Sequence, residues 1–141
     1  MGHEEHFDFY AAGPFFNEAQ VESMEAMEEV LEAHGKTLFK PRKHEHRGTG
    51  PAACFADDVE GIAASDAVIA NLVDGDTGTM WEIGYAYALG KPVYGYLDGL
   101  RPGERVNLMI TQSVCAIFAS REALARFLET GETEELELAE F

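Results

Sequence analysis

Short apolar runs recur along the chain, and each is about as long as a buried strand. The first, residues 7–12, is rich in aromatic side chains and stops at Gly13-Pro14, which is typical of a strand entering a tight turn. The near-continuous apolar run at residues 66–72 suits a parallel strand that is covered on both faces. Further strands are predicted at residues 37–40, 92–97 and 114–118.

Between these runs, apolar residues recur at three- and four-residue steps, which indicates amphipathic helices. In residues 16–31 they stand among acids, and His34-Gly35 supplies a stop signal. The polar stretch at residues 42–51 contains several Gly and Pro residues, which predicts a mobile loop. Further helices are predicted at residues 52–64, 79–89 and 121–128.

Strands and helices alternate through the whole sequence, and no repeat or linker divides it. We therefore expect a single α/β domain over residues 1–141, with one doubly wound five-stranded parallel sheet of the flavodoxin or Rossmann type. Such sheets bind ligands at the carboxyl ends of their strands. The turns after the first and third strands, residues 12–15 and 74–82, are the expected site.

Composition narrows the classes of partner. The chain has 26 acidic and 10 basic residues, a formal charge of −16, and a surface that negative repels a phosphate backbone. We therefore expect no nucleic-acid partner. The acidic runs at residues 22–32 and 129–140 are interpreted as a solvated helix face and a tail, although an acidic chain with four Lys also suits a high-salt cytoplasm.

The cysteines and the hydropathy pattern bear on the compartment. Cys54 and Cys115 stand in apolar surroundings without metal-site spacing, so we expect buried thiols in a reducing compartment. No apolar run approaches the ~20 residues that a membrane helix needs. We expect a cytoplasmic protein that binds neither a membrane nor a metal, and we interpret His44 and His46 as solvent-exposed loop residues.

Acidic residues are the candidates for chemistry. Glu82 is expected near a helix N-terminus, where the macrodipole favours the ionised carboxylate that a nucleophile on a sugar carbon needs. On spacing alone, however, Thr79 to Glu82 is better explained as a T-x-x-E capping box. Asp57-Asp58, taken alone, is typical of a solvated helix face. Several carboxylates converging on one cleft, Asp76 included, would nonetheless suit glycosidic chemistry.

Several segments, taken together and in this order, resemble the nucleoside 2-deoxyribosyltransferases and the related nucleotide N-glycoside hydrolases. They are residues 9–16 (FYAAGPFF), 58–62 (DVEGI) leading into 66–72, 76–86, 90–93 (GKPV) and 106–109 (VNLM). The resemblance spans nearly the whole chain.

The resemblance implies that Glu82 is the nucleophile, which forms a covalent deoxyribosyl intermediate. It also implies that Asp76 holds the sugar hydroxyls and that Asp58 contacts and protonates the leaving base. Asn107 and Met109 match a segment that a neighbouring subunit inserts beside the sugar 5′-hydroxyl. A homo-oligomer with shared active sites, a dimer or higher, follows from this resemblance, and no cofactor is implied.

The first motif adds Phe9, Gly13 and Phe15 as expected substrate-binding residues. Phe9 falls where many members of the family carry a Tyr that hydrogen-bonds the nucleophile. Tyr10 is adjacent, and because successive side chains of a strand alternate, we expect it to face away from Glu82. The base-reading loop, residues 43–47, leaves the choice between purine and pyrimidine open.

Three functions stay in view. The resemblance favours transfer of deoxyribose from a 2′-deoxynucleoside to another nucleobase. Hydrolysis of a 2′-deoxynucleoside or a nucleoside 5′-monophosphate is an alternative, in which water attacks the intermediate. Asn107 stands where the nucleotide hydrolases usually carry small hydroxyl residues, which favours free nucleosides. A non-catalytic nucleotide-binding sensor is the alternative of another class.

Overall fold

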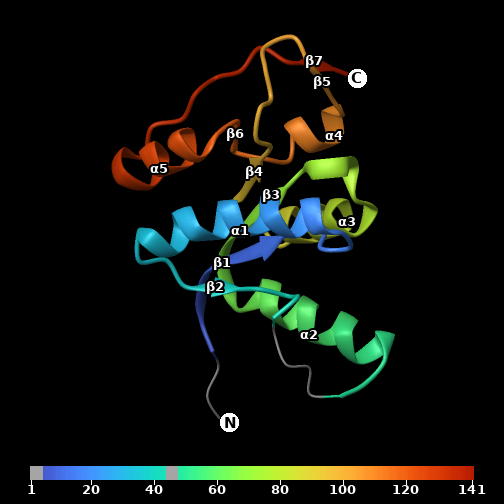
Figure 1. Ribbon diagram of the computed structural model, residues 1–141. Coiled ribbons are helices and arrows are strands. Elements are labelled where there is room, and N and C mark those ends of the chain that lie inside the picture. Colours follow the sequence, from blue (N-terminus) through green and yellow to red (C-terminus); the bar gives the residue numbers. More distant parts are fainter. Residues whose placement is uncertain (1–4, 44–47) are drawn as a thin grey trace.

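The computed structural model describes residues 5–43 and 48–141. Within these residues, five strands form one parallel sheet in the order β2-β1-β3-β4-β6 (Figure 1). The predicted α/β fold with a five-stranded parallel sheet is therefore confirmed. The strands are β1 (Phe7–Ala12), β2 (Leu38–Phe39), β3 (Ser65–Asn71), β4 (Val93–Tyr96) and β6 (Ala116–Phe118).

Helices cover both faces of the sheet, as a doubly wound fold requires. On one face α1 (Glu18–Ala33) and α5 (Arg121–Thr130) pack against the sheet, with Met24, Met27 and Leu124 in a buried cluster. On the other face α2 (Pro51–Ala63) and α3 (Thr77–Ala88) bury Ile62, Ile83 and Ala86. The apolar steps that predicted these helices are the positions that now fill the two halves of the core.

β1 contributes to both halves because its side chains alternate. Phe9 and Ala11 belong to the cluster under α1 and α5. Tyr10 and Ala12 belong to the cluster under α2 and α3. Tyr10 is therefore the buried β1 side chain on the α3 side that carries a polar group.

α3 begins at Thr77, two residues before the predicted start. Asp76 is its N-cap, and the turn before it contains the short 3-10 helix η1 (Val73–Gly75). Thr79 is buried within the first turn of the helix, so it does not start a capping box with Glu82. The predicted capping box is wrong because an acid three residues before Thr79 occupies the cap.

The end of the chain is structured in part, where a solvated tail was expected. β7 (Ala139–Glu140) pairs in parallel with β5 (Arg105–Val106), and the guanidinium of Arg105 lies 4.3 Å from the ring centre of Phe141. The short helix α4 (Leu108–Thr111) follows β5. In Figure 1 the C-terminus lies beside β5, and α4 is close by.

The two cysteines are less buried than the sequence predicted. Cys54 is partly exposed and Cys115 is exposed, so neither is the buried thiol that its apolar neighbours predicted. Cys115 directly precedes β6, and an edge strand leaves part of its surroundings uncovered.

Among the described helices, none combines the length and the apolar character needed to cross a bilayer.

Candidate active site

Four ionisable groups meet on the face of the sheet that α2 and α3 cover. The hydroxyl of Tyr10, on β1, donates a hydrogen bond to Oε2 of Glu82, on α3. Asp58, on α2, and Asp76, the N-cap of α3, both act electrostatically on Glu82. The structure thus brings together the three carboxylates that the sequence singled out, from three different segments.

Tyr10 was expected to face away from Glu82, and this expectation is wrong. Tyr10 is fully buried and bonded to Glu82, whereas Phe9 points into the core under α1 and α5. The alternation of the two side chains was predicted correctly. The face of the sheet on which α3 lies was not predicted correctly, because no local signal in a sequence assigns a crossover helix to one side of a sheet. Phe9 and Glu82 therefore lie on opposite faces.

The surroundings of Glu82 favour its protonated form. Burial raises the pKa of Glu82 to about 7; the hydrogen bond from Tyr10 lowers this pKa, and the negative charges of Asp58 and Asp76 raise it. The sequence had suggested the opposite, an ionised carboxylate beside a helix dipole. Glu82 lies in the second turn of α3, and the dipole effect fades within the first turn, so burial dominates.

Tyr10 is poised as a donor. Its burial, followed by the charge of Glu82, raises the pKa of its hydroxyl well above the usual value. The hydroxyl therefore keeps its proton across the physiological range, and it can orient one oxygen of Glu82.

Asp76 has a defined structural task in addition to the predicted contact with sugar. Its Oδ2 accepts from the backbone N–H of Thr79 at 2.9 Å and from the Thr79 hydroxyl at 2.8 Å. These two bonds cap α3 and fix the direction of the carboxylate.

The turn after β1 contains Gly13 and Phe15. Gly13 has φ +156°, and a Cβ at this position would lie 2.3 Å from Sδ of Met24 and 3.1 Å from Cβ of Asn71. Close packing between β1, α1 and β3 therefore requires glycine here. Phe15 is 38% exposed and stacks on Phe16, with ring centres 5.2 Å apart.

Asn107 and Met109 lie at the start of α4, on a different segment from these four groups. The Asn107 side chain caps α4 by accepting from the N–H of Met109 at 2.8 Å. Met109 is 69% exposed, and Asn107 is exposed as well. Within one chain these residues present an uncovered surface.

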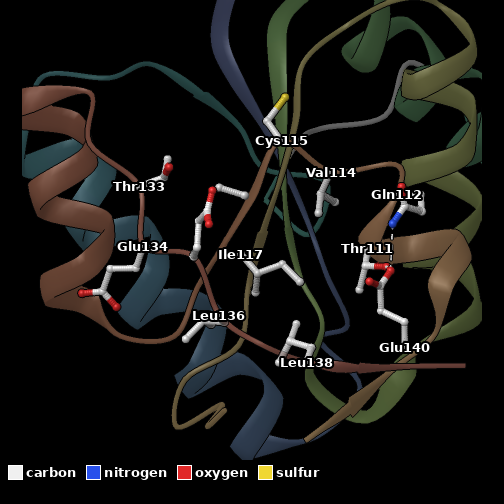
Figure 2. Close-up of a pocket in the computed structure, with 12 residues that line it drawn as sticks. Thr111, Gln112, Val114, Cys115, Ile117, Thr133, Glu134, Leu136, Leu138 and Glu140 are labelled. Carbon is white, nitrogen blue, oxygen red and sulfur yellow. Dashed lines mark hydrogen bonds between the residues drawn. The ribbon is translucent and has the colours of Figure 1, made fainter. Parts of the chain in front are cut away.

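A cavity of about 310 Å³ lies between β6, α4 and the C-terminal segment, and Figure 2 shows the side chains around it. Glu140 crosses its rim, where Oε2 accepts hydrogen bonds from the hydroxyl of Thr111 and, at 2.8 Å, from the amide of Gln112. The cavity is lined by α4, β6 and residues 133–140, so it is distinct from the group around Glu82. These bonds tie the C-terminal segment to the helix that Asn107 caps.

Metal binding draws no support from the described residues, because no group of three or more His, Cys, Asp and Glu side chains in 5–43 and 48–141 is arranged to hold an ion. His44 and His46, and the rest of the predicted base-reading loop apart from Lys43, lie outside the described residues.

Comparison with known proteins supports the resemblance seen in the sequence. A family model described as nucleoside 2-deoxyribosyltransferase matches residues 9–109. A solved 2-deoxyribosyltransferase from the psychrotolerant bacterium Bacillus psychrosaccharolyticus is 37% identical, with a TM-score of 0.72; the match covers 83% of this chain and 89% of that one. No curated protein matches the chain.

Two more distant structures share the fold. A 2-desoxiribosyltransferase from Leishmania mexicana is 23% identical, with a TM-score of 0.61 over 88% of this chain and 98% of that one. A CMP N-glycosidase from Clostridium botulinum is 22% identical, with a TM-score of 0.59 over 86% of this chain and 97% of that one.

Proposed function

Because the chain belongs to the nucleoside 2-deoxyribosyltransferase family, we propose that it moves the deoxyribose of a 2′-deoxynucleoside to a second nucleobase through a covalent bond to Glu82. The observation that carries this proposal is the partly buried Glu82 carboxyl, held by the Tyr10 hydroxyl and flanked by Asp58 and Asp76. Retaining glycosidic reactions use a fixed carboxylate as nucleophile with a further carboxyl group close to it.

In the first half of the reaction, an oxygen of ionised Glu82 attacks C1′ of the sugar. Asp58 is protonated in this reactive state: as the C1′–N bond breaks and its electron pair goes to the base nitrogen, Asp58 supplies the proton that neutralises the leaving base. In the second half, a nitrogen of the acceptor base attacks C1′, Glu82 leaves as a carboxylate, and the proton from the acceptor nitrogen returns to Asp58. No oxidant, reductant or metal enters this balance.

Tyr10 supports the attack in two ways. It holds Oε2 of Glu82, which leaves the other carboxyl oxygen to face the sugar. Its hydrogen bond also lowers the pKa of Glu82 against the effect of burial, which increases the ionised fraction near neutral pH.

Asp76 is proposed to bind the sugar hydroxyls. Its position as the helix cap supports this, because its orientation is already fixed before substrate arrives. Asn107 and Met109, exposed at the start of α4, are proposed to complete the site of a second copy of the chain, which would make the protein a homo-oligomer with shared sites. Phe15 is proposed to line the sugar or base pocket from the turn after β1.

The proposed substrates are free nucleosides and nucleobases in the cytoplasm. Two unpaired cysteines, Cys54 and Cys115, agree with a reducing compartment. The formal charge of −16 disfavours substrates that carry a phosphate dianion.

The test is to incubate the protein with a 2′-deoxynucleoside, with and without a free acceptor base, followed by chromatography and intact mass spectrometry. A new nucleoside together with a deoxyribosyl adduct on the protein is the expected result. Release of free base alone would favour hydrolysis, and absence of both would favour the non-catalytic sensor. The ribonucleoside of the same base is the matched control; it should react far more slowly because a 2′-hydroxyl withdraws electrons from the cation-like transition state.

A further inference from the structure

A buried glutamine joins the two turns that border the candidate site. Gln20 is 8% exposed and lies in the first turn of α1. Its side-chain oxygen accepts from the backbone N–H of Phe16 at 2.8 Å, in the turn after β1. Its side-chain nitrogen donates to Oδ2 of Asp74 at 2.9 Å, in the turn after β3. We call this pair of bonds the Gln20 bridge.

Asp74 occupies an unusual backbone conformation. Its φ is +60°, and among the non-glycine residues that the structure describes it alone has a positive φ. Asp tolerates this left-handed region better than most residues, but the conformation still persists only where neighbouring contacts determine it. The bond from Gln20 is such a contact, and Gly75 follows with φ +57°.

A second link runs beside the bridge. Asn71, fully buried at the end of β3, donates from its amide to the hydroxyl of Ser23 on α1 at 2.9 Å and accepts from the N–H of Val73 at 3.1 Å. The turn at residues 72–76 is therefore attached to α1 at two points. Two residues beyond Asp74, Asp76 caps the helix that carries Glu82.

We propose that Gln20 is a positioning residue for the transfer reaction, because the Gln20 bridge sets the turn that fixes Asp76 and the start of α3, and with them the reach of Glu82 to the sugar. This inference rests on the function proposed above. In the proposed role, Gln20 does not touch the reacting atoms, and it acts through Asp74. Misplacement of a reacting group by about 1 Å can cost up to about 100-fold in rate, so a distant bridge can matter for catalysis.

The simpler explanation is that Gln20 only satisfies the N–H of Phe16 at the beginning of α1. Gln20→Glu separates the two explanations. It keeps an acceptor for Phe16, removes the donor to Asp74 and places two acids against each other. Asp74→Gly removes the acceptor while tolerating the positive φ, and Asp74→Asn retains both an acceptor and tolerance of that φ.

The experiment measures the single-turnover rate of the deoxyribosyl adduct for each variant, at a temperature where circular dichroism shows it to be folded. Gln20→Glu and Asp74→Gly should each form the adduct at least about 10-fold more slowly. The double variant should be no slower than the worse single variant, because both remove one interaction. Asp74→Asn should keep most of the wild-type rate of adduct formation.

Hydrogen exchange gives a readout that does not depend on activity. In Gln20→Glu the amides of residues 72–80 should exchange faster, while those of residues 13–19 stay as in the wild type, because the Phe16 bond is kept. A folded Gln20→Glu protein with the wild-type adduct rate would overturn the proposal while leaving the proposed function intact. A wild-type protein that forms no adduct and no new nucleoside would overturn both.

Discussion

In the proposed reaction, Glu82 must satisfy two opposing demands. Attack on a sugar carbon needs the ionised carboxylate, whereas burial and the charges of Asp58 and Asp76 favour the protonated form. The hydrogen bond from Tyr10 works against both of these effects. The outcome, a pKa of about 7, keeps a large ionised fraction at neutral pH while leaving the carboxylate poorly solvated and hence reactive.

A Glu82→Gln variant should be inactive and more stable than the wild type. The pKa of Glu82 rises from 4.5 to about 7 on folding, so the folded state loses stability as the pH rises between these values. Gln removes that charge, and the variant should gain about 1–3 kcal/mol in free energy of unfolding above pH 7 and little below pH 4.5. Turnover should fall at least about 1000-fold.

Urea unfolding followed by circular dichroism at pH 4.5 and pH 8 measures this gain. An equal difference between variant and wild type at both pH values would show that Glu82 does not titrate as described. Turnover within about 10-fold of the wild type would remove Glu82 from the mechanism.

Tyr10→Phe should shift the pH profile to higher pH. Loss of the hydroxyl removes the interaction that lowers the pKa of Glu82, so that pKa rises above about 7 and the acidic limb of kcat/KM moves with it. We expect a loss of about 10-fold at pH 6 and a smaller loss at pH 8.5. Phe9→Leu, on the opposite face, is the control: it can lower the melting temperature, but it should leave the limb in place. An acidic limb of kcat/KM at the same pH in Tyr10→Phe and the wild type would contradict the proposed role of Tyr10.

At the scale of elements, the apolar pattern predicted the strands of the sheet and the four long helices, and it missed three short elements near the end of the chain. The five strands of the sheet and α1, α2, α3 and α5 were all predicted, with ends displaced by a few residues. β5 and β7 have two residues each and α4 has four, too few to show a period. β5 and β7 form because Arg105 and Ala139 meet in space, which local sequence does not encode.

The capping-box rule placed the start of α3 too late in the sequence, at Thr79. Thr79 and Glu82 match the capping-box spacing, but Asp76 and Thr79 are an equally good capping pair one turn earlier. The earlier cap is the one that forms, and it frees Glu82 to face Tyr10. The family resemblance singled out Asp58, Asp76 and Glu82, whereas their spacing alone did not, and the partner on β1 became evident only from the face that α3 covers.

Asp76→Asn should separate capping from catalysis. Asn caps a helix about as well as Asp, so the free energy of unfolding should change by less than about 0.5 kcal/mol, whereas Asp76→Ala should lose about 1 kcal/mol. Both variants should lose about 100-fold in kcat/KM if the carboxylate binds the sugar hydroxyls. In Asp76→Asn the acidic limb should also move to lower pH, since one charge that raises the pKa of Glu82 is gone. Activity retained in Asp76→Asn and lost in Asp76→Ala would reduce Asp76 to a helix cap.

At the scale of the whole molecule, the predicted site residues lie on different segments and differ in their surroundings. Glu82, Asp58 and Asp76 gather on the face that α2 and α3 cover, whereas Asn107 and Met109 sit exposed at the start of α4. The C-terminal segment braces that second group, because the carbonyl of Phe141 accepts from the N–H of Leu108 at 2.8 Å and Glu140 binds Thr111. An exposed residue held in a fixed place is suited to act on another copy of the chain.

Mixing two inactive variants tests whether sites are shared. A Glu82→Ala subunit keeps Asn107, and an Asn107→Ala subunit keeps Glu82. If Asn107 reaches the neighbour's site, a mixed dimer contains one site with both residues intact and one with neither. Random reassembly of equal amounts should then restore about one quarter of the sites, so about one quarter of wild-type activity should return.

The structure supplies the matched control for this experiment. Tyr10 and Glu82 are bonded within one chain, so mixing Tyr10→Phe with Glu82→Ala cannot rebuild a site that contains both. That mixture should stay at the average activity of its two components, while the Asn107 mixture should rise above the average activity of its own two components. Native mass spectrometry must show that subunits have exchanged in both cases. If exchange is complete and the Asn107 mixture stays at the average activity of its own two components, as the Tyr10 mixture does, Asn107 acts within its own subunit or outside any site.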